Sequence, residues 1–145
     1  MFDHCIYFNT TALARQLEKA WTRAFKEFGL TPPQAFMLRA ILDQPGLAQC
    51  EIARQLFIAR PTATRALDGL VAKGMVVRRG SKADGREQVI YPTAVAVAMR
   101  GALTEASRRA GDRLKGQLGE DAFKDTVNKI RNARIIFKRY SGAYR

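Results

Sequence analysis

Apolar residues recur every three or four positions through most of the chain, with charged residues between them. This spacing predicts amphipathic helices, because it places the apolar positions on one face of a helix. The expected helices cover residues 11–28, 32–42, 49–56, 60–73, 93–117 and 121–140. Two short strand-like runs, 75–79 and 88–91, flank a Gly- and Asp-containing segment and predict a β-hairpin. The pattern predicts a mainly α chain of four helices, a small β-hairpin and two further helices.

Local signals mark where several of these helices begin and end. Gly29 suits the end of the first helix, because glycine enters the left-handed conformation without steric cost. Thr31 and Gln34 have the spacing of a capping box that starts the second helix, and residues 43–46 predict a turn after it. Gly74, followed by an apolar residue, predicts a Schellman-type end for the fourth helix. That helix is expected to bury Ala63, Ala66, Leu67, Leu70 and Val71, and the last helix has an apolar stripe of Phe123, Val127, Ile130 and Phe137.

Composition limits the classes of protein that fit this pattern. The chain has 145 residues, and no repeat or long linker divides it, so we expect a single domain, 1–145. Two cysteines are too few for a disulfide scaffold, and Asp3 stands where a basic export leader would be. The longest uncharged stretch, residues 88–99, is far shorter than the roughly 20 residues of a membrane helix. We therefore expect a cytoplasmic protein with no membrane segment.

The charge of the chain favours a polyanionic partner. Lys and Arg number 25 and Asp and Glu 13, which gives a net charge of +12. Such a surplus attracts nucleic acid, although a basic surface that only maintains solubility has the same composition. The excess is largest in residues 94–145, where it could shield crowded phosphates, bind an anionic effector or simply face solvent.

Residues 49–91 have the layout of a winged helix-turn-helix. A first helix that packs across the DNA backbone is followed by a tight connection and a second helix that enters the major groove. The second helix begins with small, polar and basic side chains that suit groove insertion, namely Arg60, Pro61, Thr62, Thr64 and Arg65. Arg65 can reach a guanine edge or a phosphate. Arg60 is a poor N-cap, so a DNA phosphate could complete the free amides there. The alternative is an ordinary amphipathic helix in a helical core.

The hairpin adds a second basic element. Arg78, Arg79, Lys82 and Arg86 lie on or beside it. Arginine at a narrow tip can enter the minor groove, where the potential is negative. Asp84 is placed to accept the guanidinium of Arg86 and hold it extended, and the other three side chains are candidates for phosphate contacts. A solvated charged loop is the alternative interpretation of this segment.

These motifs resemble, in order and over nearly the whole chain, the MarR (multiple antibiotic resistance regulator) family of winged-helix transcription factors. The matching segments are residues 29–34, 51–56 and 61–74 and the wing residues 84–86. The resemblance implies a homodimer in which the first, fifth and sixth helices interlock and two winged parts read a pseudo-palindrome. It also implies that residues 30–93 bind DNA and that residues 1–29 and 94–145 form the dimerisation part. Ala48 departs from the family, which usually has Ser or Thr as the cap of the following helix.

The resemblance further implies that a ligand or an oxidant weakens DNA binding. Aromatic and basic residues of the first two helices are candidates for a pocket that takes a small aromatic or anionic effector: Phe8, Arg15, Trp21, Phe36 and Arg39. At helical spacing, however, Trp21 and Phe36 also fit a plain core. Redox sensing would use Cys5, near the start of the first helix, or Cys50, in a first turn where the helix dipole favours a thiolate.

Other chemistry has little support in the sequence. Asp3, His4 and Cys5 form a short cluster, but a single histidine cannot build a multi-histidine metal site, so we expect no metal and no cofactor. No catalytic arrangement and no phosphate-cradling glycine motif can be assembled, so we expect no enzyme. We expect a homodimeric repressor that binds double-stranded DNA specifically and is released by an effector. A cysteine-based redox regulator, a nucleoid-type protein and a winged helix that binds protein are the alternatives.

Overall fold

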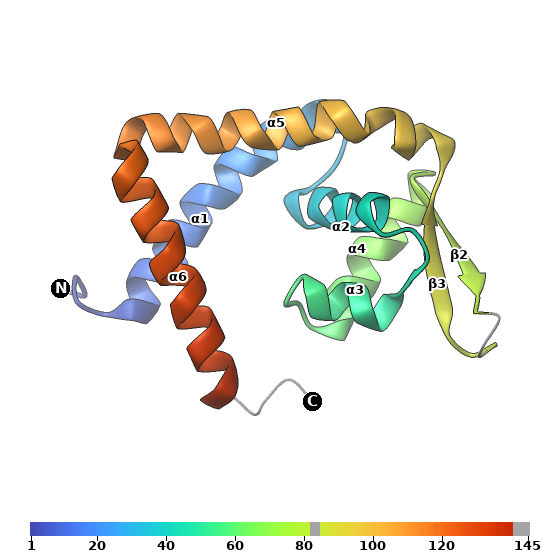
Figure 1. Ribbon diagram of the computed structural model, residues 1–145, viewed down its shortest axis with the longest axis horizontal. Coiled ribbons are helices and arrows are strands. Elements are labelled where there is room, and N and C mark those ends of the chain that lie inside the picture. Colours follow the sequence, from blue (N-terminus) through green and yellow to red (C-terminus); the bar gives the residue numbers. More distant parts are fainter. Residues whose placement is uncertain (82–84, 141–145) are drawn as a thin grey trace. The chain divides into compact units, whose positions relative to one another are not determined.

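The computed structural model describes residues 1–81 and 85–140 and is mostly helical, with a small three-stranded antiparallel sheet (Figure 1). This confirms the predicted fold class. The chain divides into two compact units, Met1–Ser107 and Arg108–Arg145. The elements are, in order, α1 (Ile6–Phe25), the 3-10 turn η1 (Lys26–Phe28), α2 (Pro32–Asp43), β1 (Leu47–Ala48), α3 (Gln49–Gln55), α4 (Arg60–Ala72), β2 (Val76–Gly80), β3 (Gln88–Pro92), α5 (Ala94–Leu118) and α6 (Glu120–Tyr140).

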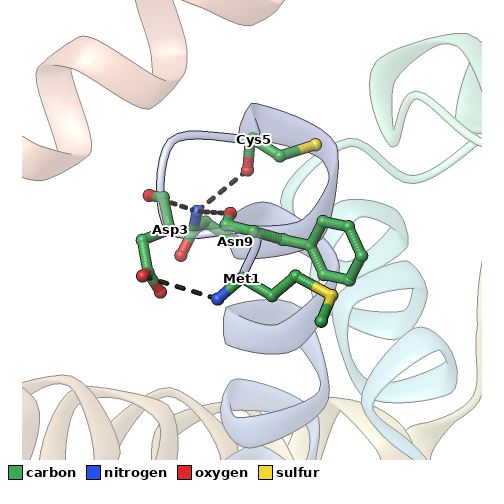
Figure 2. A network of polar contacts seen from close by, with 5 residues as sticks. Met1, Asp3, Cys5 and Asn9 are labelled. Atoms are coloured by element: carbon green, nitrogen blue, oxygen red, sulfur yellow. Dashed lines mark hydrogen bonds and ion pairs between the residues drawn. The ribbon is translucent and has the colours of Figure 1, made fainter.

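Helix α1 begins at Ile6, five residues earlier than the apolar spacing predicted. The reason is a local hydrogen-bond network around Asn9 (Figure 2). The Asn9 side-chain amide donates to the carbonyl oxygens of Phe2, Asp3 and Cys5 at 3.3, 3.0 and 2.9 Å. It thereby folds the residues before α1 back against its first turn. The spacing of apolar residues gives no information about such a hydrogen bond, so it could not predict this start of α1.

The corner between α1 and α2 follows the prediction closely. Gly29 has φ +65°, in the left-handed region. Thr31 is the N-cap of α2, and both halves of the capping box with Gln34 are present. Gln34 N–H donates to the Thr31 hydroxyl at 3.4 Å, and Thr31 N–H donates to Gln34 Oε1 at 3.2 Å. The start of α2 is therefore set by local hydrogen bonds.

The sheet contains one strand more than the predicted hairpin. Strands β2 and β3 pair antiparallel, with Val77 opposite Tyr91, and β1 pairs with the other edge of β3, with Leu47 opposite Ile90. The strand order is therefore β1-β3-β2. A two-residue strand is too short to show an alternating pattern, so β1 could not be predicted from the sequence.

Helix α4 ends in the predicted Schellman motif. Met75 N–H donates to the Leu70 carbonyl at 2.9 Å, Gly74 N–H donates to the Val71 carbonyl at 3.0 Å, and Gly74 has φ +70°. The predicted burial of Val71 was wrong, because this side chain is 36% exposed. Leu67 and Leu70 define the inward face of α4, and Val71 lies about 100° further around the helix.

One core joins α1–α4, the sheet and the first half of α5. Its largest fully buried side chains are Phe25, Met37, Leu38, Ile41, Ile52, Leu67, Leu70, Val76, Ile90 and Leu103. No polar or charged residue is buried among the residues that the structure describes. Within those residues, no helix has the length and apolar character needed to cross a membrane.

The second unit contains the last part of α5 and all of α6, which meet at Gly119, with φ +91°. Ion pairs of α6 join residues one turn apart, Lys124 to Glu120 at 3.1 Å and Lys129 to Asp125 at 2.8 Å. The hydrogen bond from Lys129 to Asp125 raises the pKa of that lysine. The apolar stripe of α6 is largely exposed in the single chain.

Candidate nucleic-acid interface

The first turn of α4 carries the side chains predicted to read DNA. Ala59, not Arg60, is the N-cap, so the prediction of Arg60 as the cap was wrong by one residue, and Arg60 and Pro61 occupy the first two helical positions. Ala59 has no side chain that could accept a hydrogen bond from the first turn. The free amides of this turn therefore point out of the helix end without a side-chain partner, an arrangement that suits an anion.

The four side chains predicted to read bases, those of Arg60, Thr62, Thr64 and Arg65, are all exposed. Within the described part of the chain neither of the two arginines has an ion pair. Thr64 differs, because Gln49 Nε2 donates to its hydroxyl at 3.0 Å and the hydroxyl donates to the Arg60 carbonyl at 3.0 Å. Sequence reasoning missed Gln49, whose partner lies 15 residues away in another helix. The two arginines and Thr62 are thus free to contact bases, whereas Thr64 is held by its own protein.

A shallow open hollow of about 260 Å³ lies between α3 and the start of α4. It is lined by Gln49, Cys50, Ala53, Arg60, Ala63 and Thr64. Its lining includes a guanidinium, a carboxamide and a hydroxyl, so this surface offers hydrogen-bond donors around the first turn of α4.

The hairpin arginines are partly engaged with their own protein. Arg78 forms an ion pair with Asp68 of α4, and its side chain is 26% exposed. The guanidinium carbon of Arg79 lies 4.8 Å from the centre of the Tyr91 ring, a cation–π distance. Both contacts fix strand β2 and its arginines against neighbouring elements. Sequence reasoning missed Asp68 and Tyr91 because neither pairing is local.

The tip of the wing is only partly described. Lys82 and Asp84 lie outside the described residues, so the predicted pair between Asp84 and Arg86 stays a prediction. Arg86 is exposed, just before β3. Ser81 N–H donates to the Glu87 carbonyl at 2.8 Å, which extends the β2–β3 pairing by one step toward the tip.

Three of the five residues predicted to line an effector pocket come together around Ser107 of α5. Trp21 Nε1 and Arg39 Nη1 both donate to the Ser107 hydroxyl, at 3.3 and 3.0 Å. The Arg39 guanidinium carbon lies 5.5 Å from the centre of the Phe36 ring. Phe36 in turn packs edge-on against buried Phe25, with ring centres 5.9 Å apart. Ser107 had no signal in the sequence, because its partners are 86 and 68 residues away.

The other two residues predicted for that pocket lie apart from this cluster. Phe8 packs against Phe2, with ring centres 5.3 Å apart, and is 43% exposed. Arg15 is exposed on α1, and no polar contact in the described residues links it to Trp21, Phe36 or Arg39.

Both cysteines are free and exposed. Cys5 is the N-cap residue of α1. Cys50 lies in the first turn of α3, and its Sγ is 3.7 Å from Glu87 Oε1. The charged group beside this thiol is therefore acidic, and a carboxylate does not stabilise a thiolate.

Comparison with known proteins gives consistent matches. Residues 28–87 match a family model described as MarR family. The transcriptional regulator HosA of Escherichia coli O111:H- is 27% identical over 107 residues, which cover 72% of this chain and 79% of HosA. The transcriptional repressor CouR, solved bound to a 23-mer DNA duplex, is 26% identical, with a TM-score of 0.80 over 92% of this chain and 94% of CouR. A crystal structure of MarR has a TM-score of 0.78 at 21% identity and covers 97% of this chain and 95% of that one.

Proposed function

We propose that the chain is a transcription regulator of the MarR family, whose model matches residues 28–87, and that it acts as a homodimeric repressor that binds a pseudo-palindromic DNA operator. The observation that carries the proposal is the first turn of α4, where exposed Arg60, Thr62 and Arg65 surround helix amides that have no cap. Small and basic side chains around such amides suit entry into the major groove. The DNA duplex bound by CouR, a relative at 26% identity, supports the same partner for this chain.

The hairpin would contribute contacts beside the major groove. Arg86, which Asp84 would orient, is proposed for the minor groove, and Arg79 and Lys82 for phosphates. Arg78 was predicted to contact phosphate as well. Because it is paired with Asp68, we propose that it mainly holds the wing against α4. The basic elements would then bind in fixed positions, which a sequence-specific regulator needs.

Two chains would be needed for a palindromic operator. In this proposal residues 30–93 form the DNA-binding part, and residues 1–29 and 94–145 the dimerisation part. The exposed stripe of α6 supports a second copy as partner, because Val127, Ile130 and Phe137 are 47%, 47% and 54% exposed. Monomeric proteins rarely expose an apolar stripe along a whole helix. A regulator of this kind acts on the chromosome in the cytoplasm.

An effector would act near the Ser107 cluster. Arg39 supplies a guanidinium, and Trp21 and Phe36 supply aromatic surface, a combination that suits an aromatic carboxylate. A carboxylate that takes the hydrogen bonds of Trp21 and Arg39 would replace Ser107 as their acceptor and loosen α5 from α1 and α2. Oxidation of Cys5 or Cys50 is the second candidate signal. Peroxide treatment of the Cys5→Ser and Cys50→Ser proteins tests it, because loss of DNA binding as in the parent would exclude both thiols.

The test of the proposed function is fluorescence anisotropy over a salt series. The two duplexes are DNA from upstream of the protein's own gene and a scrambled version of it. A preference of about 10³ or more for the native duplex, kept as salt rises, is the expected result. Equal affinities that fall together with salt would instead identify a nucleoid-type protein, because a purely electrostatic interaction carries no sequence information.

A further inference from the structure

The C-terminal end of α4 is tied to the corner between α1 and α2 by polar contacts. Lys73, the C-cap residue of α4, donates from Nζ to Gln34 Oε1 at 2.8 Å and also to the carbonyl oxygen of Gly29. Gln34 Oε1 accepts the Thr31 N–H as well. The oxygen that completes the capping box of α2 is therefore also an acceptor for the end of α4.

Gly69 makes room for this arrangement. A Cβ at this position would overlap Gln34 Nε2, the far end of a flexible side chain. Glycine inside a helix is unfavourable relative to alanine, and Gly69 has an ordinary helical conformation, so backbone freedom does not explain it. The close approach of the Gln34 carboxamide does. Gly69, Gln34 and Lys73 together form what we call the α4 latch.

The α4 latch links the C-terminal end of α4 to the corner between α1 and α2. Packing of the apolar core alone defines the relative position of these two segments less strictly. Apolar packing buries Leu38 of α2 and Leu67 of α4 in one core and holds the two helices together, but the hydrophobic effect is non-directional and does not by itself define the register of α4. Hydrogen bonds from Lys73 to fixed acceptors, one of them the carbonyl of left-handed Gly29, have preferred lengths and angles. They therefore define where α4 lies along its own axis.

We propose that Lys73 and Gln34 are positioning residues for DNA recognition, which hold the reading turn of α4 in register without contacting DNA themselves. The inference rests on the proposed function. Lys73 follows the last residue of α4, and Arg60 is the first, so at about 1.5 Å per residue the two lie roughly 20 Å apart along the helix. The Lys73 ammonium is already bound by two protein oxygens. Lys73 therefore affects DNA binding by holding α4 in position.

The first test replaces Lys73 by methionine, which keeps most of the unbranched apolar side chain and removes its ammonium group. The matched control is Lys26→Met, because Lys26 is an exposed lysine near the same corner and its side chain makes no polar contact among the described residues. We expect Lys73→Met to weaken binding to the native duplex by about three- to tenfold, the range of one lost hydrogen bond. The salt slope should equal that of Lys26→Met. Unchanged affinity would overturn the proposal, and so would a slope lower by about 1 than that of the control, since this is the mark of a direct phosphate contact.

Gly69→Ala is the second test, and it removes no polar group. The new Cβ displaces the Gln34 carboxamide from Lys73, while the helix gains a better helix-forming residue. The expected result is undiminished resistance to urea together with weaker binding to the native duplex. An affinity for the native duplex equal to that of the unmodified protein would overturn the proposed positioning role of the α4 latch. Failure of the proposed function shows differently, because the unmodified protein would then not distinguish native from scrambled DNA.

Discussion

Helices α4 and α6 both carry an apolar stripe, but only the stripe of α4 is covered within one chain. On α4, Leu67 and Leu70 are fully buried, whereas on α6 Ile130 is 47% and Phe137 is 54% exposed. The single chain therefore fixes the position of its reading helix by itself. For α6 it leaves an apolar surface that we assign to a second copy. On this account each chain forms its own DNA-reading helix, α4, and dimerisation sets the distance between the two α4 helices.

The largest expected effect concerns the covered stripe. Leu67→Ala should lower the free energy of unfolding by about 2–5 kcal/mol, because it removes buried methyl groups and leaves a cavity. Val71→Ala is the matched control, since Val71 is 36% exposed on the same helix, and it should cost less than a third as much. Urea denaturation at one protein concentration measures both. Equal losses would mean that α4 is not fixed by packing within its own chain.

Disruption of the exposed stripe should change the assembly and leave the fold of each chain intact. Ile130→Glu places a charge in the proposed dimer interface and should weaken dimerisation about 100-fold or more, because an unpaired buried charge is costly. Asn132→Glu adds the same charge to another face of α6 and serves as control. Analytical ultracentrifugation gives the mass of each protein. A dimer of unchanged strength in the Ile130→Glu variant would remove α6 from the interface.

A smaller effect separates the two kinds of DNA contact in the reading part. Arg65→Ala should cost about 1–3 kcal/mol at one base position and relax specificity there. Arg79→Ala should weaken binding to all sequences alike and lower the salt slope by about 1. Anisotropy on native and scrambled duplexes distinguishes the two patterns. The assigned roles are wrong if both variants lose affinity equally on both duplexes.

The smallest effect concerns the join between α5 and the first two helices. Ser107→Ala removes the acceptor that Trp21 and Arg39 share and should lower the free energy of unfolding by about 1 kcal/mol. The chain has a single tryptophan, so a shift in its emission reports directly on the lost bond. Thr104→Ala, which changes an exposed hydroxyl of the same helix, should leave the emission unchanged. An unchanged spectrum in the Ser107→Ala protein would show that the indole does not depend on this hydroxyl.

The same cluster gives a direct test for an effector. Aromatic carboxylates titrated into the protein should change the Trp21 emission, because the carboxylate would compete with the Ser107 hydroxyl for the indole N–H of Trp21. The Arg39→Met variant keeps the length of the stem but not the charge, and it should lose most of the response. Flat curves for the unmodified protein would count against this class of ligand.

The features that the sequence predicted are those determined locally. The capping box of Thr31 and Gln34 and the glycine end of α4 each involve residues close together in the chain, so spacing was sufficient to predict them. Helical periodicity also identified every long helix, because each buries or exposes one regular face.

The features that the sequence did not predict depend on distant partners. The Ser107 acceptor, the Asp68–Arg78 ion pair and the α4 latch join residues that only the tertiary fold brings together. Arg78 was predicted to be free for phosphate because its basic character was visible, whereas its partner on α4 was not. Likewise β1 depends on the edge of β3 and has no pattern of its own.

The central claim is that the two α4 helices of a dimer, each positioned within its own chain, bind one operator at a spacing set by the dimer. Insertion of 5 bp between the half-sites of the native operator tests it most directly, because about half a helical turn moves the second half-site to the opposite side of the duplex. The account predicts half-sites about 10 bp apart and an affinity for the altered duplex that falls close to that of scrambled DNA. An affinity unchanged by the insertion would contradict this claim, since the α4 helix of each chain would then bind its half-site independently of the other.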